Sequence, residues 1–213
     1  MKKTLLVLLG CWILANPGTL LAQQTSQVLI QGAMNECNAG RITHDRTSRV
    51  GHFEKGQILG EQAVALDDRS ADAHFALFCN LGELMRVDGE LSITSVMGFR
   101  RIMKELDRTL ELAPEHLDAL SAKGTFLIRL PSLLGGDRER GEKLLQYVLL
   151  KGPQAVNARL SLAKSYCANG RHSEALLLAS EALDIAQAQR MDDFTSEAAR
   201  VLAQLKANAA KAN

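Results

Sequence analysis

The chain has 213 residues, of which 46% are hydrophobic and 4% aromatic, and it carries 25 Lys plus Arg against 24 Asp plus Glu. This balance provides no net positive field, which argues against a nucleic-acid-binding protein or a basic membrane-surface protein. Plentiful Leu and Ala, with few β-branched runs or hairpin turns, predict an all-α protein.

The first 22 residues follow the plan of a secretory signal segment. Lys2 and Lys3 form a basic start, residues 5–14 form a mostly apolar run, and a cleavage position follows Ala22. The run is too short to span a membrane comfortably, so we expect no membrane span after cleavage. The remaining chain is expected in the periplasm or secreted. The alternative is a lipoprotein anchored at Cys11, because residues 8–11 resemble a lipobox.

Three cysteines follow the signal segment, at Cys37, Cys79 and Cys167. In an oxidising compartment they form either one disulfide and one free thiol or three buried thiols. The apolar helical segments around Cys79 and Cys167 favour buried thiols at these two positions. No pair has the spacing of zinc ligands, so we predict no metal site.

Apolar periodicity and helix breakers predict a series of helices along the chain. The predicted ranges are 27–42, 53–66, 72–86, 92–112, 115–130, 138–150, 155–168, 173–186 and 194–205. A polar loop is expected over residues 41–51, and Gly98 leaves open a bend that divides the fourth helix. Asp137 is placed to cap the helix that follows two glycines. The tail at 207–213 is expected to fray.

Three of these helices begin in the same way. The pair Asp72-Ala73 recurs as Asp118-Ala119 after 46 residues and as Asn157-Ala158 after another 39. Such a recurrence indicates a helical repeat array, predicted as repeats at about 27–70, 71–116, 117–154 and 155–187 in one domain over residues 23–206. The spacings exceed a unit of about 34 residues, and we expect the excess in loops near 87–98 and 130–137.

Residues 157–186 carry the spacing of small and aromatic positions found in the tetratricopeptide repeat, and the chain resembles this family over residues 27–187. The positions that carry the resemblance are Ala63, Pro114, Gly124, Pro153, Ala163, Tyr166, Gly170, Ala175 and Ala182. The resemblance implies a right-handed α-solenoid of antiparallel helix pairs. It also implies a concave binding face lined by the first helix of each pair.

Matching the concave positions of such an array identifies candidate partner-binding residues. They are Asp72, Phe75, Asp118, Thr125, Arg129, Asn157 and Lys164. The combination of Arg129, Asn157 and Lys164 suits a peptide carboxylate or an acidic side chain. Alternatively, these are ordinary polar residues on a helix face.

No motif of a catalytic site is present in the sequence, neither a nucleophile elbow nor a metalloprotease helix nor a phosphate loop. The five histidines stand in no recognised ligand order. We therefore predict a protein that is not an enzyme and needs no cofactor. Its predicted function is a scaffold for a protein or peptide partner, not for nucleic acid, in the bacterial envelope.

A narrower resemblance indicates an alternative function. Residues 130–137, read as Leu-Pro-Ser-Leu-Leu-Gly-Gly-Asp, lie between two predicted helices of a late repeat behind a signal segment. In this respect the chain looks like the periplasmic T-component proteins of TRAP-type solute transporters. That resemblance implies a solute-binding protein as partner and a small organic solute as ligand. The solute would occupy an apolar tunnel formed with the inserted segments near 92–98 and 130–136.

Overall fold

The computed structural model describes residues 17–88 and 93–212, and all regular structure in these residues is helical. The elements are α1 (Pro17–Ile42), α2 (Arg46–Leu66), α3 (Ala71–Asp88), α4 (Ile93–Leu112), α5 (Leu117–Arg129), the short 3-10 helix η1 (Ser132–Leu134), α6 (Arg138–Lys151), α7 (Val156–Ala168), α8 (His172–Ala188) and α9 (Asp192–Ala212). The predicted all-α class is confirmed.

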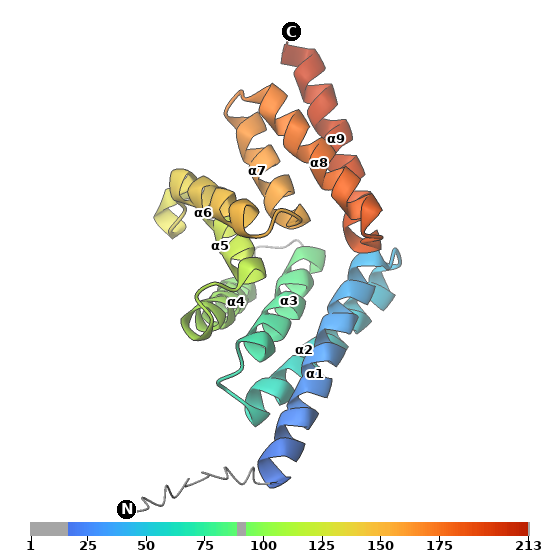
Figure 1. Cartoon of the computed structure of the whole chain (residues 1–213), viewed down its shortest axis with the longest axis vertical. Helices are drawn as coiled ribbons and strands as arrows, with labels where there is room; N and C mark the ends of the chain where they lie inside the picture. The colour runs from blue at the N-terminus through green and yellow to red at the C-terminus, as the bar shows by residue number, and fades with distance from the viewer. Residues whose placement is uncertain (1–16, 89–92, 213) are drawn as a thin grey trace, which may run out of the picture.

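The helices pack as successive antiparallel pairs, α1 with α2, α3 with α4, α5 with α6 and α7 with α8, and α9 packs against α7 and α8 (Figure 1). Small side chains line the seams, since Ala63, Ala163, Ala175 and Ala182 have no exposed surface. At Gly124, a Cβ would come within 2.8 Å of the Leu145 side chain, so α5 and α6 approach too closely for any larger residue. The arrangement is an α-solenoid of helix pairs.

The predicted loop over residues 41–51 is wrong from Arg46 onward, because α2 begins there. Asp45 caps the helix: its Oδ2 accepts hydrogen bonds from the backbone N–H of Ser48 at 2.8 Å and from the Ser48 hydroxyl at 2.7 Å. Residues 46–48 are polar because the first turn is exposed to solvent. Polarity therefore marked an exposed helical turn, not a break in the helix.

The two predicted insertions differ in structure. Near 87–98, α3 continues to Asp88 and α4 is helical from Ile93 through Gly98, so the predicted loop and the alternative bend at Gly98 are wrong for the described residues. Residues 89–92 lie outside the described residues. Residues 130–137 do form a loop, which contains η1.

The two ends of the chain are more helical than predicted. α1 begins at Pro17, and α9 runs to Ala212, so the predicted frayed tail is wrong up to that residue. Ala and Lys have high helix propensity, which explains a continuous last helix. Most of the predicted signal segment, including Cys11, lies outside the described residues. Within the described ranges, no helix is both long and apolar enough to cross a membrane.

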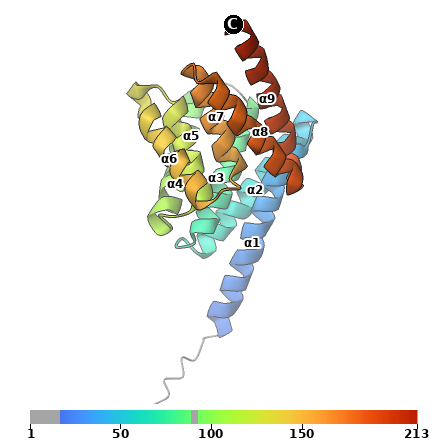
Figure 2. The same ribbon diagram turned by 45° about the horizontal axis from the view of Figure 1, so that its top comes forward.

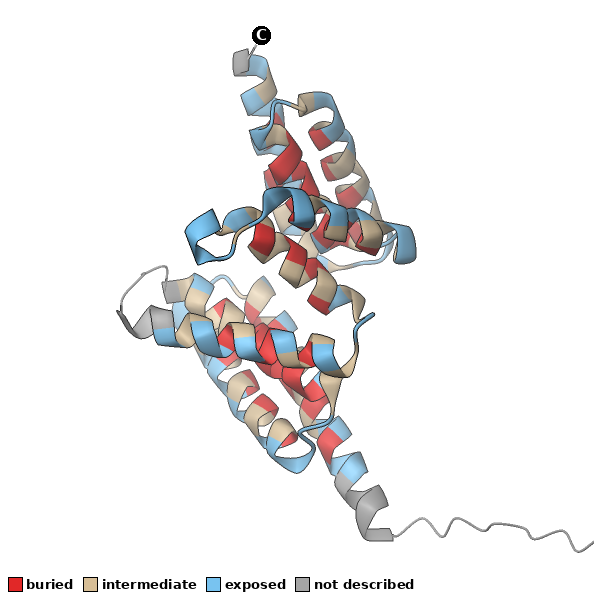
Figure 3. Cartoon of the chain, turned by 90° about the vertical axis from the view of Figure 1, so that its left-hand side faces the viewer, coloured by how far each residue is buried: buried red, intermediate tan, exposed pale blue. Residues whose placement is uncertain are grey.

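Among the described residues, the buried hydrophobic side chains form three clusters rather than one continuous core. Figure 3 shows buried positions gathered in α1 to α4 and again in α5 to α9. The central cluster contains Phe78 of α3, Ile102 and Leu106 of α4, and Ala119 of α5. It therefore joins the two halves of the array through the second helix pair and the start of the third.

A disulfide links Cys37 of α1 to Cys79 of α3, with 6.3 Å between their Cα atoms. The interpretation of Cys79 as a free buried thiol is therefore wrong. The two cysteines are 42 residues apart, so the sequence did not indicate their pairing. They meet because α1 and α3, the first helices of two successive pairs, lie side by side. Cys167 carries a free, half-buried thiol.

The last helix returns to the first, so the array curves back on itself (Figures 1 and 2). Arg41 at the end of α1 makes this contact. Its guanidinium lies 2.9 Å from Oε1 of Glu83 on α3, 3.6 Å from Oδ2 of Asp193 on α9 and 5.6 Å from the ring centroid of Phe194. Burial raises the pKa of the Asp193 carboxyl, and the attraction of Arg41 only partly opposes this shift.

We expect Gly56→Ala to destabilise the fold. A Cβ at Gly56 would lie 2.0 Å from Oδ1 of Asn80, which is fully buried and whose Nδ2 donates to the carbonyl oxygens of Ala33 and Ala76, both at 2.9 Å. Asn80 cannot move without losing these bonds, so the free energy of unfolding should fall by roughly 2–4 kcal/mol. Urea unfolding followed by circular dichroism measures this loss.

The matched control is Gly51→Ala in the same helix, where nothing lies within 4 Å of the added Cβ. Because alanine favours helix more than glycine, this variant should gain about 0.5–1 kcal/mol. Equal unfolding midpoints for the two variants would contradict the packing of α2 against Asn80.

Loss of the disulfide should also destabilise the protein. The double variant Cys37→Ser/Cys79→Ser frees the unfolded chain from a cross-link, and its free energy of unfolding should fall by roughly 2–4 kcal/mol. A reducing agent should lower the wild-type stability by a similar amount and leave the variant unchanged. Cys167→Ser is the control, and a titration that finds three free thiols in the folded wild type would refute the pairing.

Candidate partner-binding surface

Four of the predicted concave residues make contacts that join one helix pair to the next. Oδ1 of Asp72 on α3 lies 3.6 Å from Nε2 of His116, and the Phe75 ring lies 4.6 Å from the His116 ring at the start of α5. Thr125 on α5 donates to Oγ of Ser161 on α7 at 2.8 Å. These side chains therefore fasten successive helix pairs together.

Lys164 makes the corresponding contact further along, where its Nζ donates to Oε1 of Glu197 on α9 at 3.0 Å. Burial raises the pKa of the Glu197 carboxyl, but Lys164, Arg86 and Arg200 together outweigh burial, so the net shift is downward. Arg86 belongs to α3, so charges from α3, α7 and α9 meet at this point of the concave face. Two of the four charged candidate residues, Asp72 and Lys164, thus have partners within the chain.

The other three predicted residues, Asp118, Arg129 and Asn157, are exposed. Within residues 17–88 and 93–212, no hydrogen bond or ion pair is recorded for their side chains, and none joins Arg129, Asn157 and Lys164 to one another. The structure thus leaves these three side chains available but does not assemble them into a carboxylate clamp.

The sequence did not indicate that the outer face of α4 is a candidate binding surface. A shallow depression of about 490 Å³, here called the α4 groove, follows this face. Its lining residues are Phe99, Arg100, Met103, Lys104, Asp107, Arg108 and Glu111. Their spacing of three and four residues places them on one side of a single helix.

A smaller depression of about 170 Å³, here called the loop pocket, adjoins the α4 groove and shares two lining residues with it. Its lining residues are Phe99, Met103, Lys123, Phe126, Leu127, Leu130, Leu134 and Gly135. In the floor of the pocket, the Phe126 ring packs edge-on against Phe99 at 5.8 Å and against Phe78 at 6.3 Å. The lining is mostly apolar and combines α4, α5 and the inserted loop.

The inserted loop has a defined backbone. Gly135 adopts φ 85°, and a Cβ at Gly136 would lie 1.8 Å from the carbonyl oxygen of Leu130, so both positions require glycine. The N–H of Asp137 donates to the carbonyl of Leu127 at 2.8 Å, which closes the loop onto α5. The predicted capping role of Asp137 is confirmed, because its Oδ1 accepts from the Arg140 N–H at 3.0 Å.

This loop displays two large apolar side chains to solvent. Leu133 is 98% exposed and Leu134 is 65% exposed. Met97, two residues before the shared lining residue Phe99, is 75% exposed. Adjacent exposed leucines between glycines and a proline were the sequence signal for this surface, but only the structure places α4 beside them.

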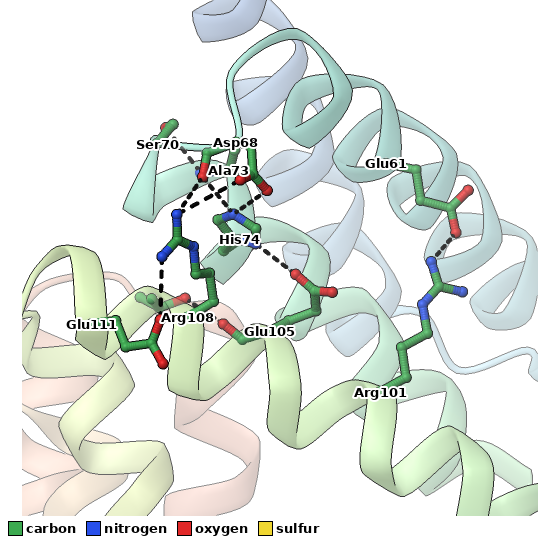
Figure 4. A network of polar contacts seen from close by, with 10 residues as sticks. Glu61, Asp68, Ser70, Ala73, His74, Arg101, Glu105, Arg108 and Glu111 are labelled. Carbon is green, nitrogen blue, oxygen red and sulfur yellow. Dashed lines mark hydrogen bonds and ion pairs between the residues drawn. The ribbon is translucent and has the colours of Figure 1, made fainter.

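The opposite side of α4 is held by polar contacts to α2 and α3 (Figure 4). Arg101 donates to Glu61 at 2.5 Å, and Oε2 of Glu105 lies 2.6 Å from Nδ1 of His74. At the edge of the α4 groove, Arg108 lies 3.6 Å from Asp68, in the turn between α2 and α3. Because His74 and Glu105 are buried, this anchoring orients α4 and leaves its outer face free.

The His74–Glu105 pair is also a contact that the sequence did not indicate, because its members are 31 residues apart. Nε2 of His74 faces the carbonyl oxygen of Asp68 at 3.1 Å, so both ring nitrogens lie against oxygen acceptors. The neighbours of this imidazole all hold helices together, which favours a structural role.

Comparisons with known proteins agree with the fold. No protein-family model matches the chain, and no curated protein matches it in sequence. A solved structure described as a functional characterization of Pseudomonas aeruginosa PilF matches with a TM-score of 0.51 at 16% identity, over 86% of this chain and 77% of that one. This match and the observed pairing define the chain as an α-solenoid of tetratricopeptide-like helix pairs.

Two further solved structures show weaker similarity. MamA from Desulfovibrio magneticus RS-1 matches with a TM-score of 0.45 at 16% identity, over 84% of this chain and 96% of that one. YrrB, a tetratricopeptide repeat protein with an unusual peptide-binding site, matches with a TM-score of 0.35 at 16% identity, over 68% of this chain and 84% of that one. At these TM-scores, neither match supports an inference about this chain.

Proposed function

We propose that the protein is a partner-binding scaffold of the bacterial envelope that holds a protein partner on the α4 groove, the loop pocket and Leu133. The observation that carries this proposal is the exposure of Leu133 and Leu134 on an internally hydrogen-bonded loop beside an apolar pocket. Exposed apolar surface that is contiguous and rimmed by polar residues typically marks an interaction site. A pre-formed loop also loses little conformational entropy on binding.

Two features support an envelope location. The sequence begins with a segment that has the plan of a secretory signal. The Cys37–Cys79 disulfide belongs to an oxidising compartment such as the periplasm, because cytosolic thiols are kept reduced. The exposed concave residues Asp118, Arg129 and Asn157 remain available to a second segment of the same partner.

Photo-cross-linking in the native cell tests this function. A photoreactive amino acid at position 133 should yield a covalent adduct with a specific protein, because this side chain is almost fully exposed at the proposed interface. The same amino acid at Leu177 on α8, which is 61% exposed, is the control and should yield no such adduct. Mass spectrometry identifies the partner and the cross-linked segment.

Leu134→Asp should reduce the adduct at position 133 at least about tenfold, since it places a charge in the loop pocket. No adduct at position 133, or equal adducts at positions 133 and 177, would contradict a scaffold that uses this surface.

The loop pocket also favours a second candidate function, that of a TRAP-transporter-associated component that binds a solute-binding protein and a small organic solute. The pocket, of about 170 Å³, is mostly apolar and is formed by the inserted loop that carries the resemblance to T-component proteins. Lys123 lines it, and its Nζ, which pairs with Asp107 at 2.6 Å, would have to exchange this partner to bind the carboxylate of an organic acid.

Titration of the isotope-labelled protein with small monocarboxylates tests the solute function. NMR shifts should map to the loop pocket and should disappear in Met103→Trp, which fills the pocket. A solute-binding protein should be the adduct found at position 133. Shifts that persist in Met103→Trp, or the absence of any shift, would exclude the solute function and leave the scaffold function intact.

A further inference from the structure

The outer face of α4 carries excess positive charge. Arg100 and Lys104 line the α4 groove, are exposed, and have no polar partner in the part of the chain that the structure describes. The remaining charges are neutralised within the chain, since Asp107 pairs with Lys123 at 2.6 Å and Arg108 with Glu111 at 3.2 Å. The groove therefore presents two unpaired cations beside the apolar side chains of Phe99 and Met103.

The shape of the groove suits a helix better than a small molecule. Its lining extends along α4 from Phe99 to Glu111, which corresponds to roughly 18 Å or three helical turns. A small-molecule site encloses most of its ligand, whereas this depression lies open along one helix. The loop pocket at one side offers a deeper place for a single large apolar side chain.

The helix that carries the groove, α4, is also held in place by contacts to neighbouring helices. On the opposite side of α4, Arg101 pairs with Glu61 of α2 and Glu105 pairs with His74 of α3 (Figure 4). Ile102 and Leu106 of α4 are buried. A partner that binds the outer face therefore does not have to order α4 first, which limits the entropic cost of association.

We propose that the α4 groove binds an acidic amphipathic helix of a partner protein. Apolar side chains of that helix, spaced by three or four residues, lie over Phe99 and Met103, and one enters the loop pocket. Its carboxylates lie against Arg100 and Lys104. An amphipathic helix in an apolar groove is a recurrent mode of recognition, and the flanking charges select its sign. The inference rests on the proposed scaffold function and specifies its partner.

Selection from a displayed library of helix-forming peptides tests the inference. The library is panned on the purified protein without bias in charge. The enriched peptides should carry a net negative charge and an apolar stripe at helical spacing. Their affinity, measured by fluorescence anisotropy, should fall at least about tenfold for Arg100→Glu/Lys104→Glu, because reversing rim charges turns attraction into repulsion. The control Arg190→Glu/Lys206→Glu makes the same change in net charge at exposed sites elsewhere and should bind as the wild type does.

The outcomes separate this inference from the proposed function. The proposal of an acidic helix is overturned if the enriched peptides are basic or neutral. It is also overturned if they bind the Arg100→Glu/Lys104→Glu variant with the affinity that they have for the wild type. If the adduct at position 133 is still formed, the scaffold function stands with a different partner chemistry. Peptides that lose no affinity for Leu134→Asp bind elsewhere on the protein and overturn the inference as well. Absence of both enriched peptides and the adduct overturns the inference and the scaffold function together.

Discussion

The contacts of Arg41 hold together parts of the array that are far apart in sequence. Its guanidinium joins α1 to Glu83 on α3 and to Asp193 on α9, directly beside the disulfide between Cys37 and Cys79. Both carboxylates are largely buried, and Arg41 compensates the charge of each, with Arg86 as a second partner of Glu83 at 3.0 Å. The disulfide fixes α1 against α3, and Arg41 links these helices to α9, which packs mainly against α8 and α7. These contacts close the curved array.

This closure determines which surfaces remain for a partner. Because α9 returns to α1, the charges of α3, α7 and α9 meet on the concave face and are largely engaged by one another, as the pairing of Lys164 with Glu197 illustrates. On the outer face of α4, Asp107 pairs with Lys123 of α5, whereas Arg100 and Lys104 have no polar partner among the described residues. The inserted loop stands beside this face with Leu133 and Leu134 exposed. The inserted loop, which departs from regular repeat spacing, thus provides two of the exposed apolar side chains of this surface.

Local patterns predicted the local structure well where one helix face is apolar. The spacing of Phe99, Ile102 and Leu106 correctly indicated α4, and Asp137 correctly indicated the start of α6. The errors have local causes too. An exposed first turn capped by Asp45 resembled a loop, and the residues after α3 resembled an insertion although α4 is helical from Ile93. For residues 46–48, polar composition reports exposure to solvent rather than the absence of helix.

The sequence by itself determined the all-α class, the order of the helix pairs and the position of the inserted loop, because these depend on residues close together in the chain. Only the tertiary structure decided the pairing of Cys37 with Cys79, the contact of Arg41 with Asp193 and the position of α4 beside the loop. Each of these depends on how successive helix pairs rotate against one another. That rotation is the sum of many small packing choices between residues distant in sequence, which no local pattern records.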